Sequence, residues 1–232
     1  MKSIASLVLG IACLFMVRRK KVSKYVELFD ETLKNLKGKP RILIQACCAP
    51  CSSAVLELLA DKFEIVLFFN GHNIYPYEEY EKRLKEVKRL VEIARHDFKA
   101  TIELIVMNPQ IEEYNQKLAF GADQKEGGTR CLACYGMRLK ETLDFARENK
   151  IKYVTTVMTI SRQKCSEKIN QTAENLMPLY PELNYVYSDF KKRHGNTRSN
   201  ELCKEYNLYQ QQYCGCSYSL LEYYQRSSDK ME

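Results

Sequence analysis

The sequence predicts an α/β protein, with a parallel β-sheet and helices packed on both of its faces. Short apolar or β-branched runs of strand length alternate with amphipathic runs of helix length along most of the chain. Strands that alternate with helices pair in parallel, because each helix carries the chain back across the sheet. With 232 residues and 45% hydrophobic content, the chain can bury a core without disulfides.

The predicted elements follow in order from residue 23. Residues 23–37 place apolar side chains on one helical face, and the sequence GKP ends that helix. The runs at 41–46, 63–70, 101–107 and 152–160 have the length and composition of strands. Helices are predicted at 50–62, where Pro50 opens the first turn, and at 76–97, 134–150 and 161–177.

This pattern predicts a Rossmann-like (HUP-like) sheet that is followed by a different kind of segment. Residues 178–212 are tyrosine-rich and less periodic, and we expect a helical or irregular segment that lies over the sheet. No internal repeat or low-complexity linker interrupts the sequence. Residues 24–226 are therefore predicted to form a single α/β catalytic domain.

Residues 1–23 form an apolar and basic leader. The 14 apolar residues 4–17 are fewer than the ~20 that span a bilayer, and basic residues follow at 18–21. Three interpretations stay open: a membrane anchor, an apolar helix packed on the domain, and a non-native start, since Met16 could begin the protein. The length argues against membrane contact through 4–17, and the charge bias predicts a cytoplasmic domain.

The net charge of +7 rests largely on that leader. Residues 18–21 supply four of the positive charges, and the excess without them is +3. Such a balance is compatible with a polyanionic partner such as a nucleic acid, but does not require one.

Seven of the ten cysteines fall in three close groups, which are Cys47, Cys48 and Cys51, then Cys131 and Cys134, then Cys214 and Cys216. A chain of this size in a reducing compartment has no need of a disulfide scaffold. The groups therefore indicate metal or redox chemistry.

Three motifs are predicted to meet at one edge of the sheet. Ligands of open parallel sheets bind beyond the carboxyl ends of the strands. The first cysteine group follows the first strand directly, NGHNIYP follows the second, and TISRQK follows the fourth. The first cysteine group is therefore expected in the active crevice.

Two cysteine pairs could together bind a metal. CLAC at 131–134 opens a helix and presents two thiols on one face, a spacing suited to metal binding. With two thiols of the first group they make four ligands, enough for zinc or a [4Fe-4S] cluster. Spacing alone favours zinc. Cys51 stays open as a spare ligand, a second-metal ligand or a core residue.

The third group, C-x-C, suggests redox chemistry. A disulfide between Cys214 and Cys216 would close a very small ring and would be strained. Strain raises the reduction potential, which suits a bond that is made and broken, and Gly215 supplies the backbone freedom. We prefer a redox pair over the alternative, in which both thiols ligate the metal.

Six motifs together resemble those of the QueH-type epoxyqueuosine reductases. They are ACCAPCS, FFNGHNIYPYEEYEKR, RCLACYGMRLKET, TTVMTISRQK, DFKKR and YQQQYCGCSYSL, in the family's order and at compatible spacing. The resemblance runs from about Arg41 to Leu220, and the joint occurrence of CCxPC, CxxCYxxR and YCGC is highly specific.

The resemblance implies an activity that composition does not. It implies two-electron reduction of the epoxide of epoxyqueuosine at the wobble position of tRNA, which gives queuosine and water. This is the last step of tRNA queuosine biosynthesis, here without cobalamin and with an unidentified electron donor.

The resemblance also assigns the cysteines and reverses the preference for zinc. It implies a redox-active disulfide of Cys214 and Cys216, and one additional iron for which Cys51 is the ligand to test. The implied ligands of a [4Fe-4S] cluster are Cys47, Cys48, Cys131 and Cys134.

Residues that bind the substrate are less specified. The predicted contacts within the motifs are Asn73, Arg138, Ser161, Lys164, Asp189 and Arg193. Arg83, Arg162 and Lys192 are further phosphate contacts by this interpretation, and the late tyrosines could stack on unpaired anticodon bases. The candidates for the proton donor to the epoxide oxygen are Asp189, Tyr213 and His72.

Two departures from the family pattern and two alternative functions complete the prediction. The chain has NGHNIYP where the family usually has YNPNIHP, and Cys165 stands where asparagine is usual, which puts the substrate pocket in doubt.

A PP-loop-like tRNA thiolation enzyme would need an SGGxDS-type loop, which CCAPCSSA is not. An iron–sulfur electron-transfer or sensor protein would explain the cluster but not the C-x-C.

Overall fold

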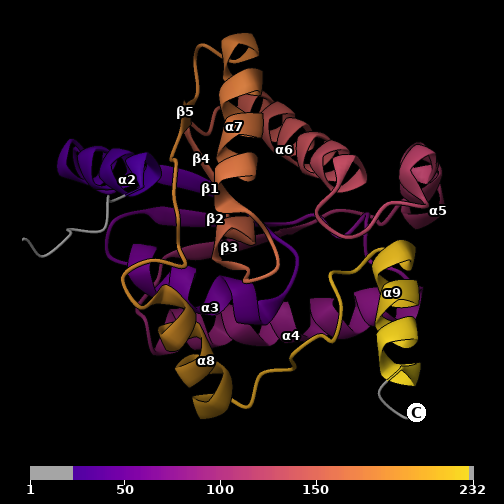
Figure 1. Cartoon of the computed structure of the whole chain (residues 1–232). Coiled ribbons are helices and arrows are strands. Elements are labelled where there is room, and N and C mark those ends of the chain that lie inside the picture. The colour runs from indigo at the N-terminus through magenta and orange to yellow at the C-terminus, as the bar shows by residue number, and fades with distance from the viewer. Residues whose placement is uncertain (1–22, 230–232) are drawn as a thin grey trace, which may run out of the picture.

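The computed structural model describes residues 23–229 and contains one parallel sheet (Figure 1). Its strand order is β3-β2-β1-β4-β5, and every pair of neighbours runs parallel. The strands are β1 (Arg41–Ala46), β2 (Glu64–Phe69), β3 (Ile102–Val106), β4 (Tyr153–Thr156) and β5 (Asn184–Tyr185). The predicted α/β fold class with a Rossmann-like parallel sheet is therefore confirmed.

Helices connect the strands and continue beyond them. The α-helices are α2 (Lys24–Lys34), α3 (Ala49–Leu59), α4 (Tyr77–His96), α5 (Ile111–Lys117), α6 (Thr129–Glu148), α7 (Ser166–Leu176), α8 (Gly195–Glu205) and α9 (Ser217–Ser228). The short 3-10 helices are η1 (Ala119–Gly121), η2 (Val157–Ile160) and η3 (Met177–Leu179). Within residues 23–229, none of these helices combines the length and hydrophobicity that crossing a membrane requires. The predicted leader, residues 1–23, lies outside the described residues except for Ser23.

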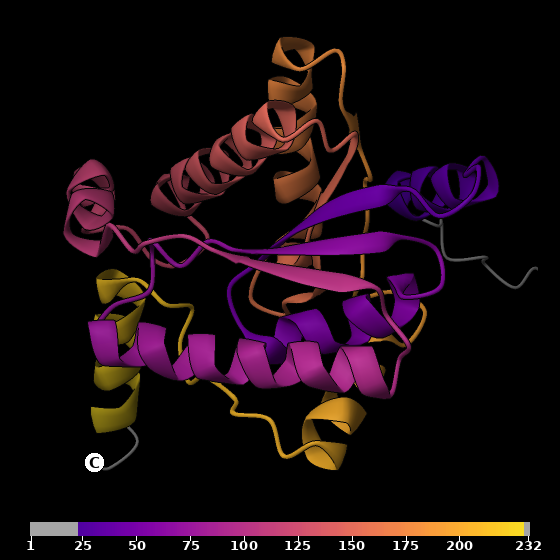
Figure 2. The same ribbon diagram turned by 180° about the vertical axis from the view of Figure 1, so that it is seen from behind.

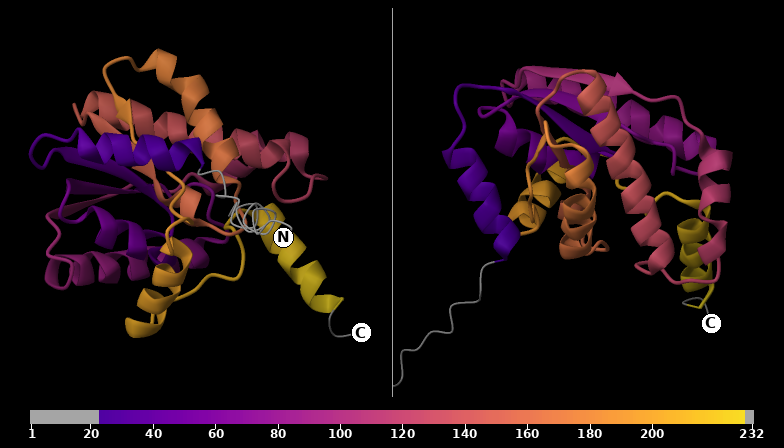
Figure 3. Two further views of the ribbon diagram at one scale, coloured as in Figure 1. Left: turned by 60° about the vertical axis from the view of Figure 1, so that its left-hand side comes forward. Right: turned by 90° about the horizontal axis from the view of Figure 1, so that it is seen from above.

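The sheet separates two hydrophobic cores. Successive side chains of a strand point to opposite faces, so Ile42 and Ile44 pack with α3 and α4, whereas Leu43 packs with α6 and α7. Figures 2 and 3 show α3, α4 and α8 on one side of the sheet and α6 and α7 on the other. The near-continuous apolar composition of the strands follows from this burial on both faces.

Several boundaries differ from the predicted ones for local reasons. The strand predicted at 152–160 ends at Thr156, because its Oγ1 atom accepts a hydrogen bond from the Met158 amide (3.1 Å) and begins η2. The helix predicted at 134–150 begins earlier, at Thr129, so both cysteines of CLAC lie in its first turns. The tyrosine-rich segment adds β5 to the sheet and packs α8 against α3, where Ser199 donates to the carbonyl of Pro50 (2.7 Å).

Candidate active site

The first cysteine group lies where β1 gives way to α3. β1 ends at Ala46 and α3 begins at Ala49, so Cys47 and Cys48 occupy the connection. Cys47 and Cys48 are buried, and Cys51, in the first turns of α3, is half-buried. The thiols of Cys47 and Cys51 both influence the pKa of Cys48, which places them close to it. The three sulfurs therefore lie together at the carboxyl end of the central strand.

This environment favours neutral thiols. The hydrogen bond with Cys48 and burial raise the pKa of Cys47. For Cys48, the hydrogen bond with Cys47 lowers the pKa, but the bond with Cys51 and burial outweigh it and raise the pKa to about 12. Metal binding at these sulfurs would therefore release protons.

The second pair lies in the first turns of α6. The Sγ atom of Cys131 accepts a hydrogen bond from the Gly127 amide (3.2 Å), in the loop before the helix. Cys134 is buried, and burial raises its pKa to about 12. The hydroxyl of Tyr114 on α5 donates to the carbonyl of Cys134 (3.1 Å) and lies 3.8 Å from its sulfur. These contacts hold both thiols on the side of α6 that faces α5 and α9.

The C-x-C pair precedes α9, and both of its cysteines are free thiols in the structure. Cys216 is the N-cap of α9, and its Sγ atom accepts a hydrogen bond from the Ser219 amide (3.4 Å). Gly215 has φ +141°, and a Cβ atom there would lie 3.0 Å from the Asn73 amide nitrogen. This backbone conformation favours glycine between the two cysteines, and the close approach leaves little room for a Cβ atom.

Buried Arg83 of α4 fixes the backbone of the C-x-C segment. Its guanidinium donates to the carbonyls of Cys214 (2.9 Å) and Tyr213 (3.1 Å) and pairs with Glu79 (2.7 Å). The side chain is 1% exposed, so all these bonds are shielded from water. Arg83, which the sequence suggested as a phosphate contact, thus has its donors on protein acceptors. Nothing in the sequence signals this role, because residues 83 and 214 are far apart along the chain.

The last two cysteine groups line one enclosed cavity. Its lining includes Cys131 and Cys134 of α6 and Cys214 and Cys216 before α9. The other lining residues are Asn73, Leu118, Glu126, Arg130, Tyr135 and Ser219. We call this space the thiol cavity. It brings together side chains that are more than eighty residues apart in the sequence.

Two buried cations connect the thiol cavity with the first cysteine group. Arg138 is 1% exposed and lies close enough to Cys47 and Cys134 for both thiolates to raise its pKa, against the effect of burial. Lys164 is also buried, and negative charge on Cys214, Cys47 and Cys51 would raise its pKa despite burial. All three cysteine groups therefore surround the same pair of positive charges.

Arg138 is incompletely hydrogen-bonded. Its Nε and Nη2 atoms are buried and have no hydrogen-bond partner within the described residues. Buried guanidinium groups without acceptors are costly, so such a group indicates a place where an anion binds. Within residues 23–229, no group of three or more His, Cys, Asp or Glu side chains is arranged so that it could hold one metal ion.

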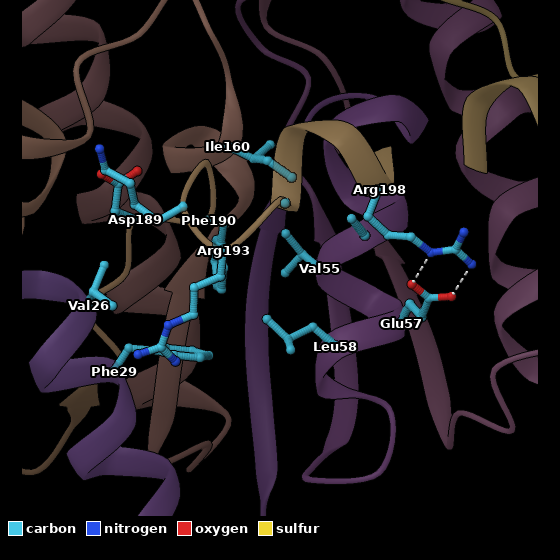
Figure 4. Close-up of a pocket in the computed structure, with 13 residues that line it drawn as sticks. Val26, Phe29, Val55, Glu57, Leu58, Ile160, Asp189, Phe190, Arg193 and Arg198 are labelled. Atoms are coloured by element: carbon cyan, nitrogen blue, oxygen red, sulfur yellow. Dashed lines mark hydrogen bonds and ion pairs between the residues drawn. The ribbon is translucent and has the colours of Figure 1, made fainter. Parts of the chain in front are cut away.

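The other predicted substrate contacts divide between two places. Asn73 is buried in the thiol cavity, where its Oδ1 atom has no partner within the described residues, and Ser161 lies in the turn that leads to Lys164. Asp189 and Arg193 instead line a separate apolar cavity between α2, α3 and α8 (Figure 4), and none of the described cysteines belongs to its lining. Arg193 is paired with Asp30 of α2 there.

The two charged residues that line the thiol cavity, Glu126 and Arg130, were not singled out from the sequence. Arg130 is 2% exposed and joins α6 to α9 through an ion pair with Glu222 (3.2 Å) and contact with the ring of Tyr218. Glu126 lies in the loop before α6, and its Oε1 atom is buried without a hydrogen-bond partner within the described residues. The only sequence signal for Arg130 and Glu126 was their position next to CLAC. That position does not reveal which side chains line the thiol cavity.

The fold and the site together define a class of protein. A Rossmann-like sheet whose carboxyl edge gathers seven reduced thiols around buried cations is suited to thiol-based redox or metal chemistry. The model of the family "Epoxyqueuosine reductase QueH" matches residues 42–222. The chain belongs to this family, and it is therefore an oxidoreductase of the epoxyqueuosine reductase type.

Curated relatives agree with the family match. A protein named epoxyqueuosine reductase QueH from Staphylococcus aureus (strain Mu50) is 35% identical over 203 residues, which cover 84% of each chain. The Streptococcus pyogenes serotype M1 protein of the same name is 35% identical over 78% of this chain and 71% of its own. The Haemophilus influenzae protein is 30% identical over 88% of this chain and 82% of its own.

Proposed function

We propose that this protein reduces the epoxide of epoxyqueuosine in tRNA to give queuosine, with a [4Fe-4S] cluster and a redox-active cysteine pair. Residues 24–226 act as one catalytic domain in this proposal. The observation that carries it is the thiol cavity, because the C-x-C and CxxC cysteines line the same space. The family match and the curated relatives support the substrate.

The residues present fit a cluster ligated by Cys47, Cys48, Cys131 and Cys134. Four thiolates and a [4Fe-4S] cluster make an anionic group, and Arg138 offers buried N–H donors that lack acceptors within the described residues. These four cysteines would hold such a cluster together, so the absence of a single-ion site in residues 23–229 does not argue against it. When bound, the cluster supplies single electrons.

Cys214 and Cys216 supply the two-electron step in this proposal. Two S–H bonds and the two C–O bonds of the epoxide break, while one S–S bond, one C=C π bond and the two O–H bonds of water form. The thiols are oxidised by two electrons and the two epoxide carbons are reduced. An external electron donor then reduces the disulfide again.

Buried positive charge assists the leaving oxygen. Lys164 lies near Cys214 and Cys47, so its ammonium group stabilises thiolates and a developing oxyanion in this region. Half-buried Cys51 lies close enough to Cys48 to influence its pKa, and it stays the residue to test as ligand of one additional iron.

Exposed tyrosines support an RNA substrate. Tyr75, Tyr77 and Tyr224 are 40–58% exposed, and ring contacts connect Tyr224 through Tyr223 to Tyr213, next to Cys214. Single-stranded RNA bases stack on such rings, at about 1–3 kcal/mol per base. Rings beside the C-x-C segment therefore suit the unpaired bases of an anticodon loop.

Replacing one thiol of the pair tests the proposal. We expect Cys214→Ser to retain the iron of the wild-type protein but to lose turnover by at least ~10³-fold, because no dithiol remains. Cys165→Ser is the control for loss of a thiol: Cys165 is exposed and outside the thiol cavity, so this variant keeps the C-x-C dithiol and should lose far less turnover than Cys214→Ser. Iron analysis and mass spectrometry of the tRNA nucleosides provide the readouts. Loss of iron in Cys214→Ser would contradict the redox role and make this thiol a ligand.

A further inference from the structure

We propose that Glu126 is the proton-transfer residue of the thiol cavity, which carries protons between solvent and the reacting groups. This inference rests on the proposed function, since it names the source of a proton that the epoxide reduction consumes. The epoxide oxygen leaves as water and gains two protons, and a side chain must deliver at least one of them inside an enclosed site.

The three proton donors considered from the sequence have other engagements. Asp189 lines the separate apolar cavity. The hydroxyl of Tyr213 donates to the carbonyl of Tyr75, and the Nδ1 atom of buried His72 accepts the Gln110 amide (3.0 Å). None of these three side chains lines the thiol cavity.

Glu126 lines two spaces at once. One is the thiol cavity, with the cysteines of both C-x-C and CxxC. The other is an open polar groove between α9 and the loop at 122–126, to which Asp123, Gln163 and Gln225 also contribute. Of the residues that line the thiol cavity, Glu126 is the one that the groove shares. Its carboxyl group therefore stands at the boundary between solvent and the thiols.

The burial and hydrogen bonding of the Glu126 carboxyl group agree with a position between solvent and the thiol cavity. The residue as a whole is half-buried, while its Oε1 atom is buried and accepts no hydrogen bond within the described residues. A buried acceptor without a hydrogen-bond partner destabilises a folded protein, so its presence here calls for a reason. Binding a proton, and passing it to a substrate oxygen or a thiolate, satisfies this atom.

The backbone fixes Glu126 at this place. Gly127 has φ +92°, which favours glycine, and its amide donates to the Sγ atom of Cys131 (3.2 Å). The Gly128 amide donates back to the carbonyl of Lys125 (3.2 Å), which closes a tight turn. Glu126 is thus held one residue from an amide that contacts a cavity sulfur.

Charged and titratable groups surround this carboxyl on both sides. Those of the thiol cavity are Cys131, Cys134, Cys214, Cys216, Tyr135 and Arg130. Those of the groove are Asp123, Lys125, Tyr218, Glu222, Arg226 and Asp229. The set includes both signs of charge, and among the described residues the ion pair of Arg130 is with Glu222 and not with Glu126.

The proton transfers balance with the dithiol chemistry. In the forward step Glu126 gives a proton to the leaving oxygen and regains one from a thiol that is being oxidised. In the reset step, an external dithiol reduces the disulfide by thiol–disulfide exchange; Glu126 gives a proton to the departing thiolate and regains one from the external dithiol as it is oxidised. The carboxyl group is unchanged over the cycle, and the dithiol reagent is the net source of electrons and protons.

The test compares Glu126→Gln with Asp123→Asn, a control that lines the groove but not the thiol cavity. We expect Glu126→Gln to bind as much iron as the wild type and to lose on the order of 10²-fold in single-turnover rate. Asp123→Asn should stay within about twofold of the wild type. Added formate should restore turnover to Glu126→Gly but not affect Asp123→Gly, because only the first lacks an internal proton carrier.

A second measurement uses no tRNA and separates this inference from the proposed function. Reduction of the Cys214–Cys216 disulfide by dithiothreitol should be about tenfold slower in Glu126→Gln than in the wild type. The inference would be overturned if Glu126→Gln reduced the tRNA as fast as an active wild-type protein. Loss of iron in that variant would overturn it too. A wild-type protein that does not reduce the tRNA would contradict the proposed function, and the reduction rates would still decide on Glu126.

Discussion

Each buried thiol of the site costs free energy when it ionises without a metal. Burial raises the pKa of Cys134 to about 12, and burial with thiol hydrogen bonds does the same for Cys48. In the unfolded chain both thiols ionise near pH 9. The folded, metal-free protein therefore keeps these protons over a pH range in which the unfolded chain releases them.

Stability of the metal-free protein should consequently fall at alkaline pH. The contribution is fully present below about pH 9 and is lost as the pH rises from about 9 towards 12. Urea unfolding of reduced, metal-free protein at several pH values from 7 to 11 measures this slope. Cys134→Ser, which has no thiol to titrate, should show a shallower slope. A free energy of unfolding that rises over this range would contradict the assigned burial.

The sequence was least informative about the roles of individual charged residues. The cysteine groups could be recognised from spacing and motif, because thiols in such patterns have few other uses. Arg83, Arg130 and Glu126 could not, since charged residues are common on surfaces and nothing local marks one as buried. Their roles depend on contacts with residues about 90 or more positions away, or on the loop that turns Glu126 inward.

At the scale of elements, the packing of α4 against the C-x-C segment is the contact that positions Cys214 and Cys216. Arg83 gives this contact its specificity, because a planar guanidinium can reach two carbonyls and a carboxylate together. A lysine at this position offers a single ammonium group and cannot satisfy all three acceptors.

Arg83→Lys should therefore destabilise the protein strongly, by about 2–4 kcal/mol, because buried acceptors lose their donor. Arg89→Lys is the matched control on the same helix. Arg89 also donates to two carbonyls, those of Tyr206 and Asn207, but its side chain is 42% exposed, so the change should cost less than about 1 kcal/mol. Urea unfolding of both variants gives the comparison. Equal losses would show that burial of Arg83 does not matter.

Predicted elements were most accurate where hydrophobic patterning was strong. The run RILIQA forms β1 over the same residues, and α4 differs from its predicted range by one residue at each end. Boundaries moved where a side chain competes with the strand or helix, as Thr156 does at the end of β4. β5 has only two residues, too few for a periodic signal, so the sequence showed it only as part of an irregular segment.

At the scale of the whole molecule, the site connects three distant parts of the chain. The first thiols follow β1, the second pair opens α6, and the C-x-C pair precedes α9. A cluster bound by the first two groups would tie the two faces of the sheet together, because α3 and α6 lie on opposite faces (Figure 1). Ligands that bind only the folded state stabilise it.

Removing the metal should accordingly lower the thermal stability of the entire domain. We expect anaerobic chelation of the iron-loaded protein to reduce Tm by at least ~5 °C, measured by circular dichroism. Cys47→Ser, which lacks one proposed ligand, should start with less iron and a lower Tm, and should change little on chelation. An unchanged Tm for the wild type would place the iron outside the folded core.

Reduction of the modified nucleoside itself tests the central claim most directly. Reduced, iron-loaded protein is incubated without oxygen with tRNA from cells that accumulate epoxyqueuosine, and the digested nucleosides are measured by mass spectrometry. The account predicts conversion of epoxyqueuosine to a product lighter by one oxygen atom, with the chromatographic behaviour of queuosine. Persistence of the epoxide with iron-loaded protein and excess reductant would contradict it.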